Sequence, residues 1–318
     1  MNEKETNIII TRIEQWYSRL QGMFVEDRQS LHAEYSWSKD PVPFANRLDK
    51  KYKSITKDKS WGKEWDSAWF RLTGKRKKEW KGKTIVADLD FSGEGLVYDP
   101  NGNEIQGITN ASIWDQNFVR TRVIIPKTCF KKDDVELWVE TAANSLFGIY
   151  VDTDPDQDNP KRHGTFDAKV VTIDIGVFRK DIWALYLDAR ILIGLVKRLD
   201  KNSVRRARII DSMNKAVVAF KDDKKDAEAS RIILSKELNK KATSSDLKAA
   251  AVGHAHIDTG WLWPVKETIR KCARTFATQL DLIDRYPDYI FGASMPQHYQ
   301  FMKDHYPKIF KRIKAAVK

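Results

Sequence analysis

The stretch GHAHIDTGWLWP, residues 253–264, decides the fold predicted for the C-terminal part of the chain. The apolar run that leads into it predicts a short strand over 247–255, and a helix is expected from Pro264 to about Arg285, with proline in its first turn. A second strand is expected over 288–295 and a second helix over 297–317. The order β-α-β-α predicts the start of a parallel α/β unit.

Three polar side chains alternate along this stretch: His254, His256 and Asp258. Because successive side chains of an extended backbone point to opposite faces, all three are expected on one side. They follow a strand predicted to be buried, and parallel α/β folds place active sites at the C-terminal ends of strands. Imidazole and carboxylate are ordinary ligands of zinc and similar ions, so the spacing indicates a metal site. The alternative, that the histidines only hydrogen-bond at a strand end, stays open.

Two tryptophans follow the polar residues. An exposed Trp261 would offer a flat apolar face to the C–H side of a sugar ring. The alternative is that Trp261 and Trp263 are both core residues, and for Trp263, between Leu262 and Pro264, core packing is expected.

In the rest of the chain, the sequence pattern changes twice between one typical of helices and one typical of strands. Helical spacing of apolar residues predicts a helix over 7–22, and short β-forming runs between about 60 and 178 predict a β-sandwich. Helices follow from Asp181 to about Leu238, with Ser203 as an N-cap. The expected domains are a helix and arm over 1–55, a β-sandwich over 56–178, a helical connector over 179–246, and the start of a (β/α) barrel, truncated, over 247–318. The β-sandwich is expected to fold by itself, and the last ~70 residues to remain partly open.

Composition narrows the class of protein. Only two cysteines occur, Cys129 and Cys272, which favours a reducing compartment and a cytoplasmic location. The N-terminus has no apolar signal-peptide core. The most apolar stretch, 183–196, contains Asp188 and Arg190, so no membrane span is expected.

Positive charge is concentrated in one region. The net charge is +12, and residues 197–241 contribute +7 of it, from 14 Lys/Arg and 7 Asp/Glu. Acidic residues are interspersed there, which is typical of a solvated helical surface, so nucleic acid is not the expected partner. The chain has no Gly-x-Ser-x-Gly, Walker A or His-Glu-x-x-His motif.

Several segments resemble one enzyme family. GHAHIDTGWLWPVKETIRKCARTF (253–276), YPDYIFGAS (286–294) and HYQFMKDHYPKIFKRIK (298–314) closely resemble the opening of the catalytic domain of family 38 glycoside hydrolases, the class II α-mannosidases, bacterial and cytosolic branch. WGKEW (61–65), FSGEG (91–95) and ETAAN (140–144) with Phe147-Gly148 resemble that branch's non-catalytic N-terminal domain.

The resemblance implies a chemistry. A metal ion, usually zinc with cobalt as the alternative, would be held partly by His256 and Asp258, with Trp261 against the sugar and His254 orienting the site. Retaining hydrolysis of terminal α-mannosides uses an Asp nucleophile and a second carboxylic acid. Both are expected beyond Lys318, so the N-terminal fragment is predicted to be inactive alone. The implied partners are a mannose-containing oligosaccharide and either a second copy or a missing C-terminal half. The alternative function is a non-catalytic carbohydrate-binding or assembly module.

Overall fold

The computed structural model describes residues 3–109, 119–144, 166–222, 224–241, 247–261 and 263–317. Phe147 and Gly148 of the family resemblance lie outside these residues. The chain divides into two compact units. The first comprises Met1–Asp27 and Val177–Ala249, and the second comprises Arg28–Gly176 and Ala250–Lys318.

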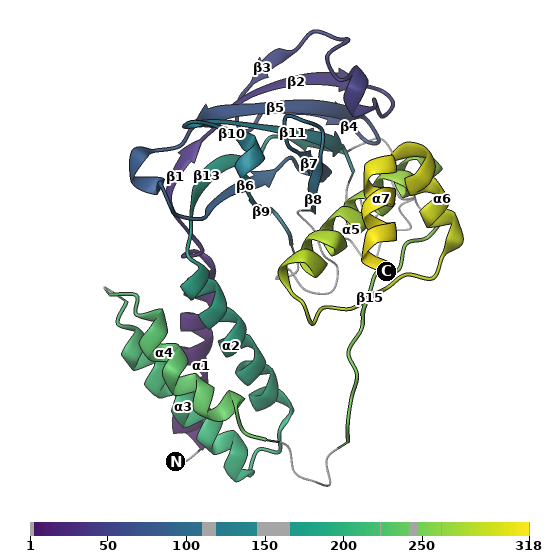
Figure 1. Cartoon of the computed structure of the whole chain (residues 1–318). Helices are drawn as coiled ribbons and strands as arrows, with labels where there is room; N and C mark the ends of the chain where they lie inside the picture. Colours follow the sequence, from purple (N-terminus) through teal and green to yellow (C-terminus); the bar gives the residue numbers. More distant parts are fainter. Residues whose placement is uncertain are drawn as a thin grey trace, which may run out of the picture. The chain divides into compact units, whose positions relative to one another are not determined.

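The first unit is helical. Its helices are α1 (Glu3–Gln21), α2 (Lys180–Arg198), α3 (Val204–Phe220) and α4 (Ala227–Leu238). Trp16 of α1 is fully buried and meets Phe220 of α3 edge-on, with 5.9 Å between ring centroids. Ser203 is confirmed as the N-cap of α3, since its hydroxyl accepts from the Arg206 N–H at 3.1 Å. The helix expected over 7–22 is also confirmed, and it packs against α2 and α3 in one unit rather than forming a separate arm (Figure 1).

The second unit contains the predicted β-sandwich. Its strands are β1 (Val25–Ser30), β2 (His32–Ser38), β3 (Lys53–Ile55), β4 (Ser60–Lys63), β5 (Ser67–Lys75), β6 (Ile85–Asp90), β7 (Glu94–Tyr98), β8 (Glu104–Ile108), β9 (Arg122–Ile124), β10 (Phe130–Lys131), β11 (Asp134–Ala142), β12 (Asp167–Lys169) and β13 (Thr172–Phe178). A seven-stranded sheet has the order β3-β2-β5-β11-β7-β8, with β10 on β11. A four-stranded sheet has the order β1-β13-β6-β9, and β12 pairs with β4.

The sandwich begins earlier than position 56, where the sequence placed its boundary. β2 pairs with β5 over seven residues, from His32 opposite Thr73 to Ser38 opposite Ser67. β3 then pairs with the far side of β2. Residues 32–55 are therefore part of the large sheet and not an arm, because their backbone groups complete its ladder.

Successive side chains of β5 point to opposite faces of the large sheet, and side chains on both faces are buried. Phe70 lies opposite Val139 of β11 and faces the smaller sheet, where its ring is 4.4 Å from that of Phe91, just after β6. Trp69 lies opposite Glu140 and faces the other way, yet it is only 3% exposed. A sheet exposes one face to water unless another layer covers it, so a second layer must lie over Trp69.

The C-terminal residues form that layer. β14 (Gly253–His254) pairs in parallel with β15 (Phe291–Gly292), and the helices are α5 (Val265–Arg285), α6 (Pro296–His305) and α7 (Pro307–Val317). The predicted β-α-β-α order is confirmed, whereas the barrel stays a prediction. The single helix expected over 297–317 is wrong, because Pro307 lacks an N–H and disfavours helical backbone at Tyr306.

The three helices pack on the outer face of the large sheet, and α5 lies along β8 (Figure 1). The shared core consists of Trp69, Leu96, Tyr98 and Trp138 from the sheet and Cys272, Ala273, Phe276, Ala277, Leu280, Met302, Ile309 and Ile313 from the helices. Phe276 and Leu280, expected to stay partly open, are each 5% exposed. The expectation that the last ~70 residues stay partly open is therefore wrong for these two residues of α5, whereas Ile269 is half-buried and Val252 and Ile290 beside the short strands are exposed as predicted.

Candidate functional site

The polar motif lies in the segment between β14 and α5. The strand ends at His254, so His256 and Asp258 belong to extended coil rather than to a long buried strand. Their side chains nevertheless meet, with 2.9 Å between His256 Nε2 and Asp258 Oδ1. His254 is exposed, and within the described residues it makes no hydrogen bond to either of them. The structure therefore brings two of the three predicted residues together.

The distance within this pair is that of a hydrogen bond, and it is also compatible with a shared metal ion. Two donors each about 2.1 Å from one ion lie roughly 2.9–3.4 Å apart at ordinary coordination angles. The His256 nitrogen and the Asp258 oxygen meet this condition, and the His256 side chain is 78% exposed. Within the described part of the chain, no group of three or more His, Cys, Asp or Glu side chains is arranged to hold a metal. Two donors are fewer than the four ligands that zinc usually takes.

Trp261 follows three residues after Asp258 and is largely exposed. It is 54% exposed and meets Trp263 edge-on, with 5.4 Å between ring centroids. Trp263 is half-buried, so the expectation that it packs in the core is wrong. Its indole N–H instead donates to Thr268 Oγ1 at 3.0 Å, and Lys271 Nζ lies 4.7 Å from the centre of its ring. Trp261 is therefore more exposed than Trp263, but neither ring is in the core.

Two residues that the sequence did not single out hold this segment. Thr268, fully buried in the first turns of α5, contacts Asp258, Gly260 and Trp263 through its hydroxyl. His298 of α6 is 6% exposed, and its Nε2 lies 3.2 Å from Thr259 Oγ1. Burial, and next the nearby His256, lower the pKa of His298. Neither residue can be recognised from the residues next to it in sequence, because each contacts a segment that the fold brings to it.

Beneath the site, α5 is joined to the sheet by buried charges. Glu267 is fully buried; it lies 2.6 Å from Arg270 and also pairs with Arg274. Arg274 Nη2 reaches Glu94 Oε2 of β7 at 3.0 Å, and Lys271 Nζ reaches the same oxygen at 2.5 Å. Burial acts to raise the pKa of Glu94, but Arg274 and Lys271 outweigh it and lower the pKa to about 2.

Arg270 extends this network into the middle of the sheet. Its guanidinium donates to Ser67 Oγ at 2.8 Å and to the Thr141 carbonyl at 3.3 Å. Glu140 accepts from Tyr306 at 3.2 Å, while its burial raises its pKa. Since a buried charge is tolerated only when it is paired and hydrogen-bonded, these contacts fix where α5 lies on the sheet.

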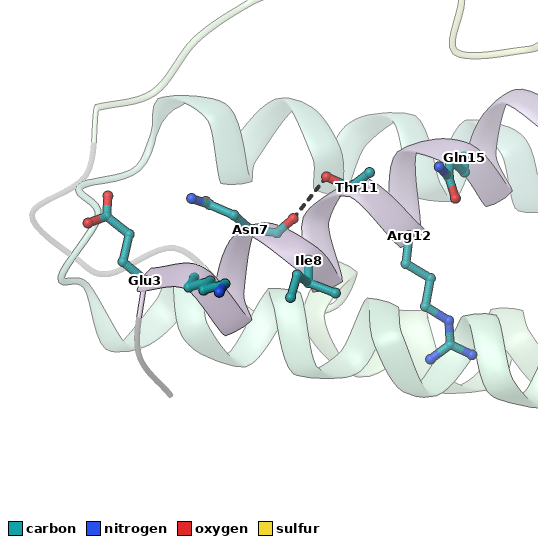
Figure 2. A pocket seen from close by; sticks show the side chains of 7 residues that line it. Glu3, Asn7, Ile8, Thr11, Arg12 and Gln15 are labelled. Atoms are coloured by element: carbon teal, nitrogen blue, oxygen red, sulfur yellow. Dashed lines mark hydrogen bonds between the residues drawn. The ribbon is translucent and has the colours of Figure 1, made fainter.

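The helical unit carries a different surface feature, a shallow hollow along one face of α1 with a volume of about 780 Å³. It is lined by Glu3, Lys4, Asn7, Ile8, Thr11, Arg12 and Gln15 (Figure 2). Thr11 Oγ1 donates to the Asn7 carbonyl at 3.0 Å, as is usual on a helix surface. Among the described residues that line it, Glu3 is the one carboxylate and none is a histidine or cysteine. None of the helices among the described residues meets the length and hydropathy needed to cross a bilayer.

Comparison with known families matches both parts of the second unit. The description "Alpha-mannosidase, jelly roll domain" matches residues 29–171, which agrees with a β domain that begins before position 56. The description "Glycosyl hydrolases family 38 N-terminal domain" matches residues 246–318, which include the His256–Asp258 pair.

Curated relatives extend over most of the chain. The chain is 28% identical to human alpha-mannosidase 2C1 over 86% of its length, and 28% identical to alpha-mannosidase G of Dictyostelium discoideum over 99%. It is 27% identical to the alpha-mannosidase of Saccharomyces cerevisiae over 79% of its length. These stretches cover 25%, 29% and 24% of the relatives, so the chain spans about a quarter of their length. The jelly-roll domain, the family 38 segment that follows it and these relatives together identify the chain as corresponding to the N-terminal part of glycoside hydrolase family 38 proteins.

Proposed function

We propose that this chain supplies part of the active site of a metal-dependent retaining α-mannosidase that hydrolyses terminal α-mannosides of oligosaccharides. The observation that carries the proposal is the His256–Asp258 pair, whose donor atoms lie 2.9 Å apart in an exposed segment. Trp261, three residues after Asp258, is 54% exposed and offers a face on which a pyranose ring would stack.

Each residue of the segment has a proposed role. His256 Nε2 and Asp258 Oδ1 hold a divalent ion, zinc or alternatively cobalt, and His254 orients the site without being a ligand. An ion held there would supply Lewis-acid character and help to orient the hydroxyls of the mannose ring. Trp261 positions the sugar. In the family the nucleophile, the acid and the remaining ligands follow later in the sequence. We therefore propose that residues 1–318 alone do not turn over 4-nitrophenyl α-mannoside.

Metal content tests the ligand assignment directly. The chain would be equilibrated with Co²⁺ or Zn²⁺ and its affinity compared in His256→Ala, Asp258→Ala and His254→Ala. The first two variants should lose specific binding, and His254→Ala should weaken it by only about 10- to 100-fold. His305→Ala, which removes an exposed histidine of α6, is the matched control. Unchanged binding in Asp258→Ala, with the fold kept by circular dichroism, would refute the assignment.

We also propose that the protein works in a reducing compartment, as the cytoplasm is. Cys129 and Cys272 are both buried free thiols. Burial is the main cause that raises the pKa of each thiol to about 12, so both are slow to ionise and to oxidise. Denatured protein purified without reductant should titrate two thiols per chain, and fractionation of the source cells should recover it with cytoplasmic markers. A disulfide, or recovery outside the cytoplasm, would count against this location.

A further inference from the structure

Thr268 of α5 is the hub of the segment that carries the proposed metal ligands. Its side chain is fully buried in the second unit. The hydroxyl donates to the Asp258 carbonyl at 3.3 Å and accepts from the Gly260 N–H at 3.2 Å and the Trp263 indole N–H at 3.0 Å. A hydroxyl has one donor and two acceptor positions, so all three are used on one short segment.

The geometry of a helix explains why residue 268 reaches this segment. Side chains of an α-helix point back toward its N-terminus, so a residue one turn inside α5 covers the chain that leads into it. That chain turns sharply at Gly260, whose φ of +78° favours glycine. The Thr268 hydroxyl closes the turn through hydrogen bonds to its three partner residues, which are half-buried or exposed.

Two further contacts hold this segment, one to α6 and one that leads through Lys271 to the large sheet. His298 Nε2 lies 3.2 Å from Thr259 Oγ1, which ties the residue next to Asp258 to α6. Lys271 stacks over the Trp263 ring while its ammonium pairs with Glu94 of the sheet. Two of the three contacts of the Thr268 hydroxyl reach the backbone of the ligand-bearing segment, at the Asp258 carbonyl and the Gly260 N–H, and the third reaches the Trp263 indole.

We propose that Thr268 is a positioning residue that fixes the 258–263 turn, so that Asp258 is held beside His256 and Trp261 is presented to a sugar before any metal binds. This inference rests on the proposed function only for the identity of the ligands. Thr268 itself touches neither the metal nor the substrate in this scheme. Its contribution is to reduce the number of conformations that the ligand-bearing segment samples, which raises affinity by preorganisation.

Three variants of the chain separate this role from general stability. Thr268→Val keeps the shape and removes all three hydrogen bonds, whereas Thr268→Ser keeps the hydroxyl. Thr278→Val is the matched control, because Thr278 is another buried threonine of α5 whose hydroxyl contacts the Arg274 carbonyl and the Gly107 N–H instead. Circular dichroism and thermal unfolding would establish that each variant is folded.

Two readouts are then compared: amide hydrogen exchange of peptides covering 255–264 without metal, and Co²⁺ affinity by titration. In Thr268→Val we expect exchange in this segment to speed up at least tenfold and Co²⁺ affinity to fall about 10- to 100-fold. Thr268→Ser should stay within a few-fold of the parent chain, and Thr278→Val should leave exchange over 255–264 unchanged.

The outcomes distinguish the inference from the proposed function. If the parent chain binds no Co²⁺, the two proposed ligands are too few for measurable binding by this chain, and exchange over 255–264 alone decides the positioning role. If Thr268→Val exchanges and binds like the parent chain, the positioning role is overturned while the ligand assignment stands. A loss of equal size in Thr278→Val would also overturn it, because the effect would then be a general weakening of α5.

Discussion

Glu94 gives the sharpest test of how the C-terminal helices are held on the sheet. It pairs with Lys271 and Arg274 of α5, and its side chain is 23% exposed. Its pKa is lowered from an ordinary 4.5 to about 2. A shift of this size corresponds to about 3 kcal/mol in favour of the charged, folded form. Glu94→Gln removes the charge with little change of shape, so it should destabilise the packing of α5 by about 3 kcal/mol at pH 7.

The pH dependence has a definite sign. Because the folded pKa lies below the unfolded one, the stabilisation is fully present above pH 4.5 and is lost as the pH falls toward 2. The difference between the parent chain and Glu94→Gln should therefore shrink from about 3 kcal/mol at pH 7 to about 1.5 kcal/mol at pH 3. Glu104→Gln is the control, since burial is the main cause that raises the pKa of Glu104 and neutralising it should cost little.

Urea denaturation followed by tryptophan fluorescence, repeated across this pH range, measures the free energy difference. Hydrogen exchange of α5 peptides assigns the transition to the second unit, and protection there should fall about 100-fold in Glu94→Gln at pH 7. Equal protection of α5 in both proteins would refute the reasoning, as would a difference that grows when the solution is acidified.

Two further predictions concern the same interface. Gly107→Ala on β8 places a methyl group 2.8 Å from both the Cβ and the carbonyl oxygen of Arg274, so it should lower the free energy of unfolding by about 1–3 kcal/mol in urea denaturation. Gly194→Ala in α2, outside this interface, is the control. Its methyl group meets only the end of Arg198 at 3.8 Å, so it should stabilise its helix by up to about 1 kcal/mol. In limited proteolysis α5–α7 should survive as long as the β-sandwich and stay bound to it after any nick between them, as seen by size-exclusion chromatography; early loss of these helices from an intact sandwich would contradict the packing described above.

Much of the architecture was predictable from local pattern. The spacing of apolar residues predicted α1, and an N-cap serine predicted the start of α3, because these signals act within one or two helical turns. The break between α6 and α7 at Pro307 was also predictable, since proline interrupts a helix by a local mechanism. The residue types at 256 and 258 likewise indicated a pair of metal-ligand residues without any knowledge of their geometry.

The tertiary structure alone decided what covers the outer face of the large sheet. Alternation in β5 showed that Trp69 and Phe70 face opposite ways, but not that α5, some 200 residues later, covers Trp69. The Arg274–Glu94 pair spans 180 residues, and no local rule relates positions so far apart. Such contacts depend on which surfaces are complementary once the elements exist.

The same limit applies to the site. The sequence by itself determined its chemistry, an imidazole and a carboxylate two residues apart, followed by an indole. It did not determine that the strand would end at His254, or that Thr268 would hold Asp258 from inside a helix. Residue identity fixes which atoms are able to bind a metal or a sugar. Their placement depends on hydrogen bonds made across a turn to another element, and those exist only when the segment has folded back on α5.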